Sequence, residues 1–214
     1  MRWLDVATGT GEVALRAARA GADVTGIDIA PAMIEAALAK DVDGRIAFEV
    51  GDAQALPYED SSFDVVSSVF GAIFAPDHLA TAGELARVGR GRLGLTAWQP
   101  NPSLGALLER FGLEQPEGRA PFLWGEEGYL QELLGDAYDL TFEERTWVIE
   151  GESGEEVWEF WSRSAPPFKA MLAGLDESTL GEFRTAYIEY CEGFREGARV
   201  AVPRPYLLVL GDRR

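Results

Sequence analysis

A glycine-rich turn near the start of the chain is the stretch best suited to hold a ligand. Residues 4–12 read LDVATGTGE, an apolar run that stops at small residues and glycine, and an alanine-rich segment follows. Glycine lets the backbone approach a ligand closely and adopt positive φ angles. The pattern is typical of a parallel strand whose end meets a ligand that carries a nucleoside. A tight strand-to-helix turn with no ligand would read the same way.

Two aspartates follow this turn at positions that suit a nucleoside. Asp28 comes directly after residues 24–27 (VTGI), and Asp52 comes after Gly51 at the end of the strand predicted for residues 46–50. A carboxylate about twenty residues beyond such a turn can accept hydrogen bonds from both ribose hydroxyls. A carboxylate at the next strand end can accept a hydrogen bond from an exocyclic amino group. The alternative for Asp52 is to cap a helix or a turn.

Strand and helix patterns alternate from Trp3 to Trp98. Strands are predicted for residues 3–7, 23–28, 46–50, 63–70 and 92–98, and helices for residues 12–20, from Pro31 onward and for residues 77–88. Pro31 suits the first position of a helix because its missing N–H is not needed there. The alternation predicts an α/β fold with a parallel sheet covered on both faces. Such a sheet would bring the glycine-rich turn and both aspartates to one edge.

The second half of the chain has a different pattern. Helices are predicted for residues 104–111 and 126–134, a strand for 138–149, a helix-rich and aromatic-rich segment for 153–196, and a buried strand for 206–210. We predict one core made of residues 1–150 and 201–214, interrupted by a helical insertion at 151–200. Most of the aromatic residues are expected to pack inside this insertion because several share one helical face, namely Phe183, Tyr187, Tyr190 and Phe194.

The composition limits the partners and the compartment. The 214 residues carry a net charge of −17, which disfavours DNA and RNA because such a surface repels their phosphates. The single cysteine, Cys191, rules out an internal disulfide and suits a reducing cytoplasm. The sequence shows neither a signal peptide nor an apolar run of membrane-spanning length. We expect a cytoplasmic protein, and the sequence leaves a homodimer open.

Four blocks, taken in their order and spacing, resemble the class I S-adenosylmethionine-dependent methyltransferases, most closely their small-molecule branch. The blocks are residues 4–11 (LDVATGTG), 26–33 (GIDIAPAM), 51–57 (GDAQALP) and 63–66 (FDVV), and the resemblance covers roughly residues 3–98. It implies a Rossmann-like, seven-stranded sheet whose last strand is antiparallel. In this layout residues 151–200 would form a helical substrate cap.

The resemblance implies that S-adenosylmethionine is the cofactor and that the strand ends bind it. Asp5 would orient the amino group of the methionine portion, directly or through water. The backbone of the glycine-rich turn would face the same portion, at Ala7, Thr8, Gly9 and Gly11. A sulfonium is already activated, so the protein would supply mainly in-line positioning and the exclusion of water.

The nucleoside is assigned by the same resemblance to the next two strand ends. Asp28 would accept hydrogen bonds from both ribose hydroxyls, and Ile29 and Met33 would lie against the adenine. Asp52 would accept a hydrogen bond from the adenine amino group, and Ala53 would supply a backbone donor. One adenosine would then lie between the two aspartates.

The resemblance implies methyl transfer to a small, partly apolar acceptor, which would lie beyond the fourth strand. Val69 and Phe70 would lie near the sulfonium and the incoming acceptor. Phe74, Trp98 and Trp124, together with Phe70, are predicted to line the acceptor site because they follow strand ends or lie in loops. The atom that receives the methyl group, whether oxygen, nitrogen or carbon, does not follow from the sequence.

His78 is the one candidate for a catalytic base. It is the only histidine and lies early in a predicted helix, where it could act near neutral pH. A surface or first-turn histidine is the alternative. We predict no metal site, because no second histidine exists and the chain has a single cysteine.

Two features depart from the family pattern. Members usually carry a helical segment before the first strand that folds over the cofactor, whereas the first predicted strand here begins at Trp3. We therefore expect either a shortened chain or another element that closes the site. The usual turn before the fifth strand is reduced to Gly89-Arg90-Gly91.

Two other functions stay open from the sequence. Residues 9–14 also fit a shortened dinucleotide loop, as in an NAD(P)-dependent oxidoreductase. The blocks at 51–57 and 63–66 argue against this reading, since they have no role in binding a pyrophosphate. The other alternative is a catalytically silent protein that kept the fold for cofactor binding or assembly.

Overall fold

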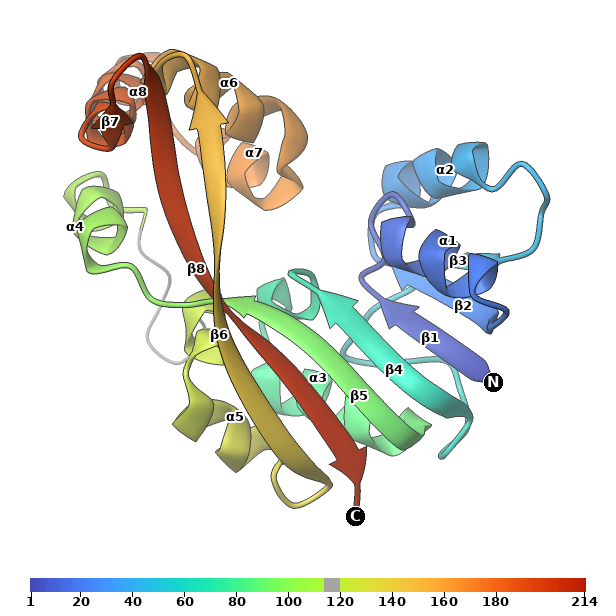
Figure 1. The fold of residues 1–214 in the computed structure, drawn as a ribbon. Coiled ribbons are helices and arrows are strands. Elements are labelled where there is room, and N and C mark those ends of the chain that lie inside the picture. Colours follow the sequence, from blue (N-terminus) through green and yellow to red (C-terminus); the bar gives the residue numbers. More distant parts are fainter. Residues whose placement is uncertain (114–119) are drawn as a thin grey trace. The chain divides into compact units, whose positions relative to one another are not determined.

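The computed structural model describes residues 1–113 and 120–214 (Figure 1). The chain divides into two compact units. The sheet unit consists of Met1–Gln99, Pro121–Glu144 and Tyr206–Arg214, and the helical unit consists of Pro100–Ala120 and Arg145–Pro205. The insertion predicted for residues 151–200 falls within the helical unit, which also includes residues on both sides of it.

The sheet combines parallel and antiparallel strands. Within the described residues its strands are β1 (Arg2–Val6), β2 (Asp23–Asp28), β3 (Ala47–Val50), β4 (Phe63–Val69), β5 (Gly89–Trp98), β6 (Tyr138–Gly151), β7 (Arg195–Glu196) and β8 (Arg199–Arg213). Their order is β3-β2-β1-β4-β5-β8-β6, and β7 pairs with β8 off this path. The pairs among β1 to β5 are parallel, whereas β8 runs antiparallel to β5. The predicted Rossmann-like α/β fold with an antiparallel last strand is confirmed, and β7 is an additional strand.

Helices connect the strands of the sheet unit as the alternation predicts. They are α1 (Glu12–Arg19), α2 (Pro31–Lys40), α3 (His78–Val88) and α5 (Glu127–Leu134), with the short 3-10 helices η1 (Ala72–Phe74) and η2 (Pro121–Gly125). Pro31 occupies the first turn of α2. Asp77 caps α3 by accepting a hydrogen bond from Ala80 N at 2.9 Å. Both helices thus begin directly after the loops that leave the strand ends.

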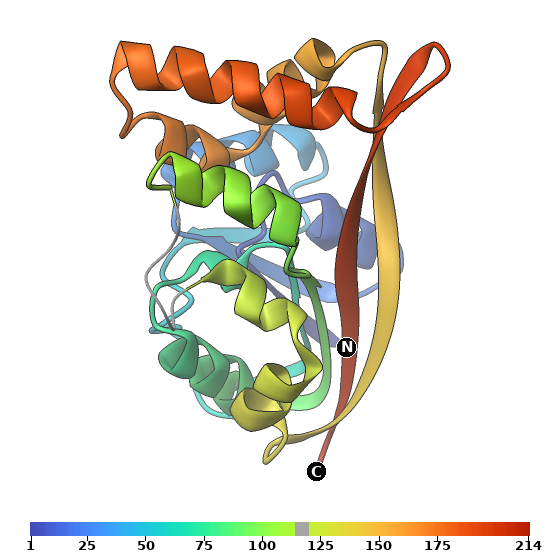
Figure 2. The ribbon, with the colours of Figure 1, turned by 90° about the vertical axis from the view of Figure 1, so that its left-hand side faces the viewer.

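The helical unit has an apolar core of its own. Its helices are α4 (Pro102–Arg110), α6 (Gly154–Ser164), α7 (Pro166–Leu172) and α8 (Glu177–Glu192). Figure 2 shows α8 along its length, and α8 packs against α6. Phe183, Tyr187 and Cys191 are buried in this core, and Tyr190 and Phe194 pack against it. The predicted packing of the aromatic residues is confirmed.

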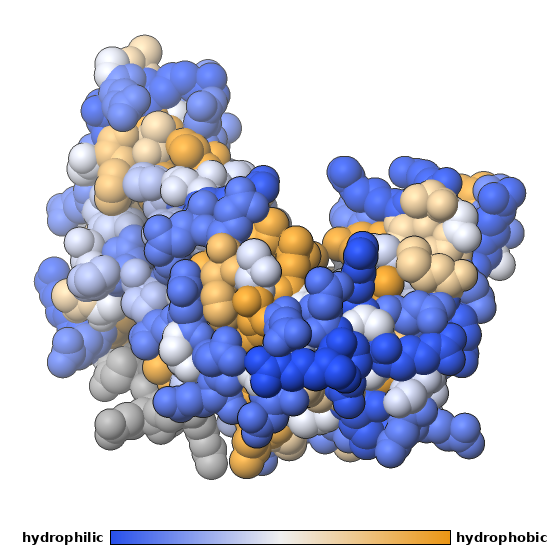
Figure 3. All heavy atoms as spheres, turned by 60° about the horizontal axis from the view of Figure 1, so that its bottom comes forward, coloured by the Kyte–Doolittle hydropathy of each residue, from blue (hydrophilic) through white to orange (hydrophobic). Residues whose placement is uncertain are grey.

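Polar residues cover most of the visible surface. On the face drawn in Figure 3 hydrophilic residues predominate and apolar atoms show between them, as expected for a net charge of −17. Among the described residues, the helices are too short or too polar for any of them to cross a membrane.

Candidate active site

The ends of the parallel strands bring the predicted cofactor residues to one edge of the sheet. The glycine-rich turn follows β1, Asp28 ends β2, Asp52 follows β3, and Phe70 follows β4. In Figure 1 the arrowheads of β1, β4 and β5 point to the same side. This is the edge at which open α/β sheets bind ligands.

The backbone of the glycine-rich turn takes left-handed angles at three positions. The φ angles of Ala7, Gly9 and Gly11 are +54°, +56° and +80°. Gly11 lies at the start of α1, where a Cβ would come within 2.9 Å of Phe48 Cζ, so a larger residue would also crowd this side chain. A Cβ on Gly9 would meet no atom within 4 Å. The space in front of Gly9 is therefore open to a ligand.

Asp28 is held at the end of β2 by two backbone amides. Its Oδ2 accepts a hydrogen bond from Gly9 N at 2.8 Å, and its Oδ1 accepts one from Ala30 N at 2.9 Å. The residue is only 8% exposed. A carboxylate offers about four lone-pair positions, so each oxygen keeps capacity for another donor. That remaining capacity matches the two hydroxyls of a ribose.

Asp5 lies beneath the turn rather than at its surface. It is 2% exposed, and its carboxylate accepts hydrogen bonds from Thr8 Oγ1 at 2.6 Å and Ser67 Oγ at 2.8 Å. Burial raises the pKa of the Asp5 carboxyl above its usual range, while the two hydroxyl donors act in the opposite direction. Asp5 thus ties the turn to β4. Its predicted role toward the amino group of the cofactor stays a prediction.

Asp52 belongs to a hydrogen-bonded loop that reaches α3. Its Oδ1 accepts a hydrogen bond from Gln54 N at 2.9 Å, and its Oδ2 accepts one from Gln54 Nε2 at 3.0 Å. Gln54 Oε1 in turn accepts a hydrogen bond from Asp77 N at 3.0 Å. Asp52 therefore forms a turn, which is the alternative stated for it from the sequence, and these hydrogen bonds fix its carboxylate at the edge.

Apolar side chains lie at the same edge. Ile29 is 68% exposed and Val50 is 54% exposed, while Met33 and Ala53 are half-buried. Adenine has apolar faces and a polar edge, so it suits a surface that combines such side chains with a carboxylate. The open turn, the two fixed carboxylates and these apolar groups together fit an adenosine-bearing cofactor.

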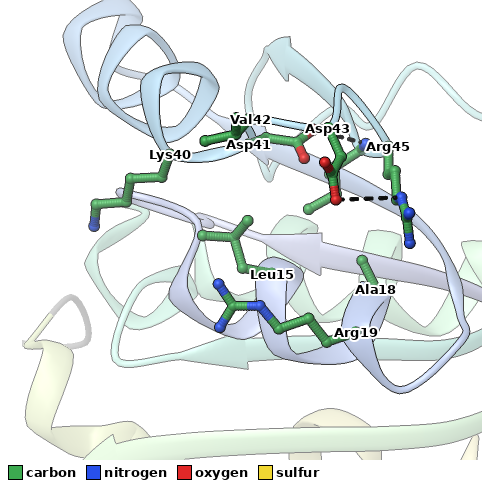
Figure 4. Close-up of a pocket in the computed structure, with 9 residues that line it drawn as sticks. Leu15, Ala18, Arg19, Lys40, Asp41, Val42, Asp43 and Arg45 are labelled. Carbon is green, nitrogen blue, oxygen red and sulfur yellow. Dashed lines mark hydrogen bonds and ion pairs between the residues drawn. The ribbon is translucent and has the colours of Figure 1, made fainter.

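A cavity elsewhere in the sheet unit is separate from this site (Figure 4). It has a volume of about 150 Å³ and lies between α1 and the segment that follows α2. Its lining residues are Leu15, Ala18, Arg19, Lys40, Asp41, Val42, Asp43, Arg45 and Ile46, none of which is predicted to bind the cofactor. Lys40 Nζ donates hydrogen bonds to Thr10 Oγ1 at 2.8 Å and Glu12 Oε1 at 2.7 Å, so α2 is tied to the glycine-rich turn.

The predicted acceptor residues differ in exposure. Val69 and Phe74 are 42% and 41% exposed, Phe70 is half-buried, and Trp98 is 7% exposed. Phe70 stacks on Trp98, with ring centroids 3.8 Å apart and ring planes inclined by 11°. Trp124 is 1% exposed, so the structure places it in the interior and not on the surface where Val69 and Phe74 lie.

His78 is a buried residue that joins three elements. It is 4% exposed, its Nδ1 lies 2.8 Å from Tyr129 Oη on α5, and its ring meets Trp124 of η2 edge-on at 5.6 Å. Burial lowers the pKa of His78 below its usual value. These contacts favour a structural role for His78 over that of a general base.

The structure adds four residues to the site that the sequence analysis did not assign to it. Ser67 holds Asp5, and Gln54 holds Asp52. Gly71 lies against the glycine-rich turn, and Tyr206 lies against Phe70. Only Gly71 carries a signal in the sequence, because a glycine directly after a predicted strand is typical of a close backbone approach.

Known proteins share both sequence and fold with this chain. Residues 4–92 match the model of a family described as a methyltransferase domain. The 27-O-demethylrifamycin SV methyltransferase of Amycolatopsis mediterranei is 34% identical over 204 residues, which cover 86% of this chain and 71% of that protein. A Mycobacterium bovis protein is 38% identical over 144 residues, which cover 64% of this chain and 53% of its own length. The chain thus spans about half the length of this mycobacterial relative.

A solved structure extends the likeness to the whole fold. The YcgJ protein of Bacillus subtilis aligns with a TM-score of 0.65 at 19% identity, covering 100% of this chain and 92% of that one. At this identity the likeness concerns the fold alone.

Proposed function

The chain belongs to the class I S-adenosylmethionine-dependent methyltransferases, and from this premise we propose that it transfers the methyl group of that cofactor to a small, partly apolar acceptor. The observation that carries the proposal is the pair of fixed carboxylates, Asp28 and Asp52, beside an open glycine-rich turn. The name of the Amycolatopsis mediterranei relative, a methyltransferase of 27-O-demethylrifamycin SV, supports an organic molecule as the acceptor. A homodimer and a cytoplasmic location stay predictions.

In this proposal the edge of the sheet binds the cofactor in two parts. Asp28 would hold the ribose hydroxyls, and Asp52 would accept a hydrogen bond from the adenine amino group. The open backbone at Gly9 would face the methionine portion, while Asp5 keeps the turn in place through its bond from Thr8 Oγ1. Each contact would be made by a group that the fold already holds in position, which reduces the entropy lost on binding.

Bound S-adenosylmethionine supplies an activated methyl group on a sulfonium, so the chain would contribute mainly orientation. Val69, which is exposed at the end of β4, would exclude water beside the transferred methyl group. Phe70, half-buried next to it, would limit the directions from which an acceptor can approach. The proposed transfer needs no strong base, because the acceptor proton can leave to solvent.

Two measurements test this function in sequence. Calorimetry with S-adenosylhomocysteine and with NADH is expected to show binding of the first and no heat from the second. The protein is then incubated with S-adenosylmethionine labelled in its methyl group and a small-molecule extract, and label is expected in an organic product. Binding of NADH without S-adenosylhomocysteine would overturn the proposal. Binding of S-adenosylhomocysteine without a labelled product would instead favour the catalytically silent alternative.

A further inference from the structure

Three aromatic rings of the sheet unit meet near the ends of β4 and β5, beside the part of β8 that pairs with the end of β5. Phe70 follows β4, and Trp98 ends β5 directly opposite Tyr206 of β8. Phe70 stacks on Trp98 at 3.8 Å, and Tyr206 meets Phe70 edge-on at 5.3 Å and 76°. We call Phe70, Trp98 and Tyr206 the ring cluster.

The backbone of Phe70 is held in an unusual conformation. Its φ angle is +54°, which a residue with a large side chain rarely adopts. Phe70 N donates hydrogen bonds to Thr96 O at 3.2 Å and Thr96 Oγ1 at 3.1 Å, which keeps the residue against β5. Strained residues of this kind gather at ligand sites, where the surrounding structure fixes them. The backbone hydrogen bonds of Phe70 therefore help to fix the position of its ring, in addition to the packing of the ring itself.

One backbone contact joins the segment that contains Phe70 to the glycine-rich turn. A Cβ on Gly71 would lie 2.4 Å from Ala7 Cβ and 2.8 Å from Ala7 O, so the two backbones touch. Ala7 also has a φ angle of +54° and belongs to the glycine-rich turn. A molecule lying on Phe70 would therefore lie next to the part of the cofactor that faces this turn.

The side chains of the ring cluster, and of Val69 and Phe74 near Phe70 in the chain, carry no charge. Trp98 is 7% exposed and stacks against Phe70, which is half-buried. Val69, which precedes Phe70 in the chain, and Phe74 of η1 are apolar as well, with exposed fractions of 42% and 41%. None of these side chains can neutralise a phosphate or a carboxylate. Aromatic rings bind other rings by stacking or by edge contacts.

We propose that the methyl acceptor carries a planar aromatic ring that stacks on Phe70. This proposal rests on the proposed function. In 2-naphthol, the probe of this class, a lone pair of the hydroxyl oxygen would form the new bond to the methyl carbon, and the carbon–sulfur bond would break with its electron pair left on sulfur. The products are S-adenosylhomocysteine and the aryl methyl ether, and the hydroxyl proton passes to water.

The test compares a flat and a saturated alcohol on protein saturated with S-adenosylhomocysteine. 2-Naphthol and decahydro-2-naphthol are titrated separately by calorimetry. We expect 2-naphthol to bind about fivefold more tightly, the scale of one aromatic stacking contact. Phe70→Leu should abolish this preference, and Phe70→Tyr should retain it. Phe142→Leu is the matched control on β6 of the same unit and should leave the preference unchanged.

The outcomes separate this proposal from the proposed function. Affinity for S-adenosylhomocysteine, measured on every variant, reports both folding and the cofactor site, and its absence in the unaltered protein would refute the proposed function itself. If that affinity is present but the two alcohols bind equally well, or neither binds, the aromatic acceptor is wrong. If Phe70→Leu lowers the affinity for both alcohols by the same factor, the proposed stacking on Phe70 is wrong. Labelled 2-methoxynaphthalene formed from 2-naphthol would support the full proposal.

Discussion

The edge formed by the strand ends has a polar half and an aromatic half, which differ in the side chains they present. Beside β1 and β2, the carboxylates of Asp5 and Asp28 are held by hydroxyl groups and backbone amides. Beside β4, β5 and β8, the ring cluster presents stacked aromatic surface. The first half offers hydrogen-bond acceptors at fixed positions, and the second offers apolar area without charge.

The difference separates two kinds of recognition. Hydrogen bonds are directional, so a ligand with a constant set of donors calls for acceptors that do not move. Apolar contact is non-directional and follows the area covered, so one exchanged side chain can change which molecule fits. The polar half is therefore suited to an invariant cofactor and the aromatic half to a particular acceptor. The two halves meet at the contact between the backbones of Gly71 and Ala7.

Asp28→Ala breaks the polar half and carries the largest expected effect. The change removes the proposed acceptors for the ribose and also the partners of Gly9 N and Ala30 N. Hydrogen bonds to a charged group contribute about 1.5–3 kcal/mol each, so the Kd for S-adenosylhomocysteine should rise roughly 100-fold or more. Calorimetry measures it. Asp23→Ala, at the exposed opposite end of β2, is the control and should leave the Kd unchanged. An unchanged Kd for Asp28→Ala would remove the basis of the cofactor assignment.

Gly71→Ala breaks the contact between the halves. The new Cβ would overlap Ala7, so the backbones must separate, and we expect a loss of about 1–3 kcal/mol in the free energy of unfolding. Gly83→Ala, in α3, is the matched control because its Cβ would meet nothing within 4 Å. The control should gain about 0.5–1 kcal/mol, since alanine favours a helix over glycine. Urea unfolding measures both, and equal stability of the two variants would show that the contact is not tight.

The sequence predicts the polar half better than the aromatic half, for a physical reason. The turn at residues 4–12 and Asp28 are local patterns, because a strand end and the loop after it are contiguous in the chain. Tyr206 reaches Phe70 only through the antiparallel register that pairs it with Trp98. That register is a property of the folded sheet and leaves no local pattern. The bond from Gln54 to Asp77 likewise joins two loops that the fold brings together.

The extent of β8 shows how a local signal can mislead. The apolar run predicts a strand at residues 206–210, whereas β8 spans Arg199–Arg213. Pro203 and Pro205 lie inside it and argue against a strand, because proline cannot donate a ladder hydrogen bond. β7 has only two residues, too few to show a period of two. Sequence patterns therefore identify the strands of the core but not the hairpin of the helical unit.

Gln54→Glu tests the polar half by adding a negative charge to it. It would place a second carboxylate beside Asp52 and remove the Nε2 donor, while an oxygen remains to accept the bond from Asp77 N. Repulsion should displace the Asp52 carboxylate and weaken binding of S-adenosylhomocysteine about fivefold. Gln131→Glu adds the same charge at an exposed position of α5 and should have no effect on the Kd. Equal affinities for both variants would mean that Asp52 does not contact the cofactor.

His78 gives the smallest expected effect, which appears in stability and not in affinity. The usual pKa of histidine is 6.5, and burial lowers the pKa of His78 in the folded state. As the pH falls below about 6.5, the unfolded state therefore binds more protons than the folded state, and the free energy of unfolding decreases. Above that pH the ring is neutral in both states, so the contribution is constant.

The His78→Gln variant isolates the contribution of His78 to the pH dependence of the free energy of unfolding, because all other titrating groups remain in both proteins. Subtracting its pH profile of unfolding free energy from that of the unaltered protein should leave a difference that changes only below pH 6.5 or so. A flat difference would show that His78 does not resist protonation. Its affinity for S-adenosylhomocysteine should stay unchanged, since Nδ1 meets Tyr129 and not the strand-end edge. If methyl transfer were lost while stability and that affinity were kept, the general-base role would have to replace the structural one.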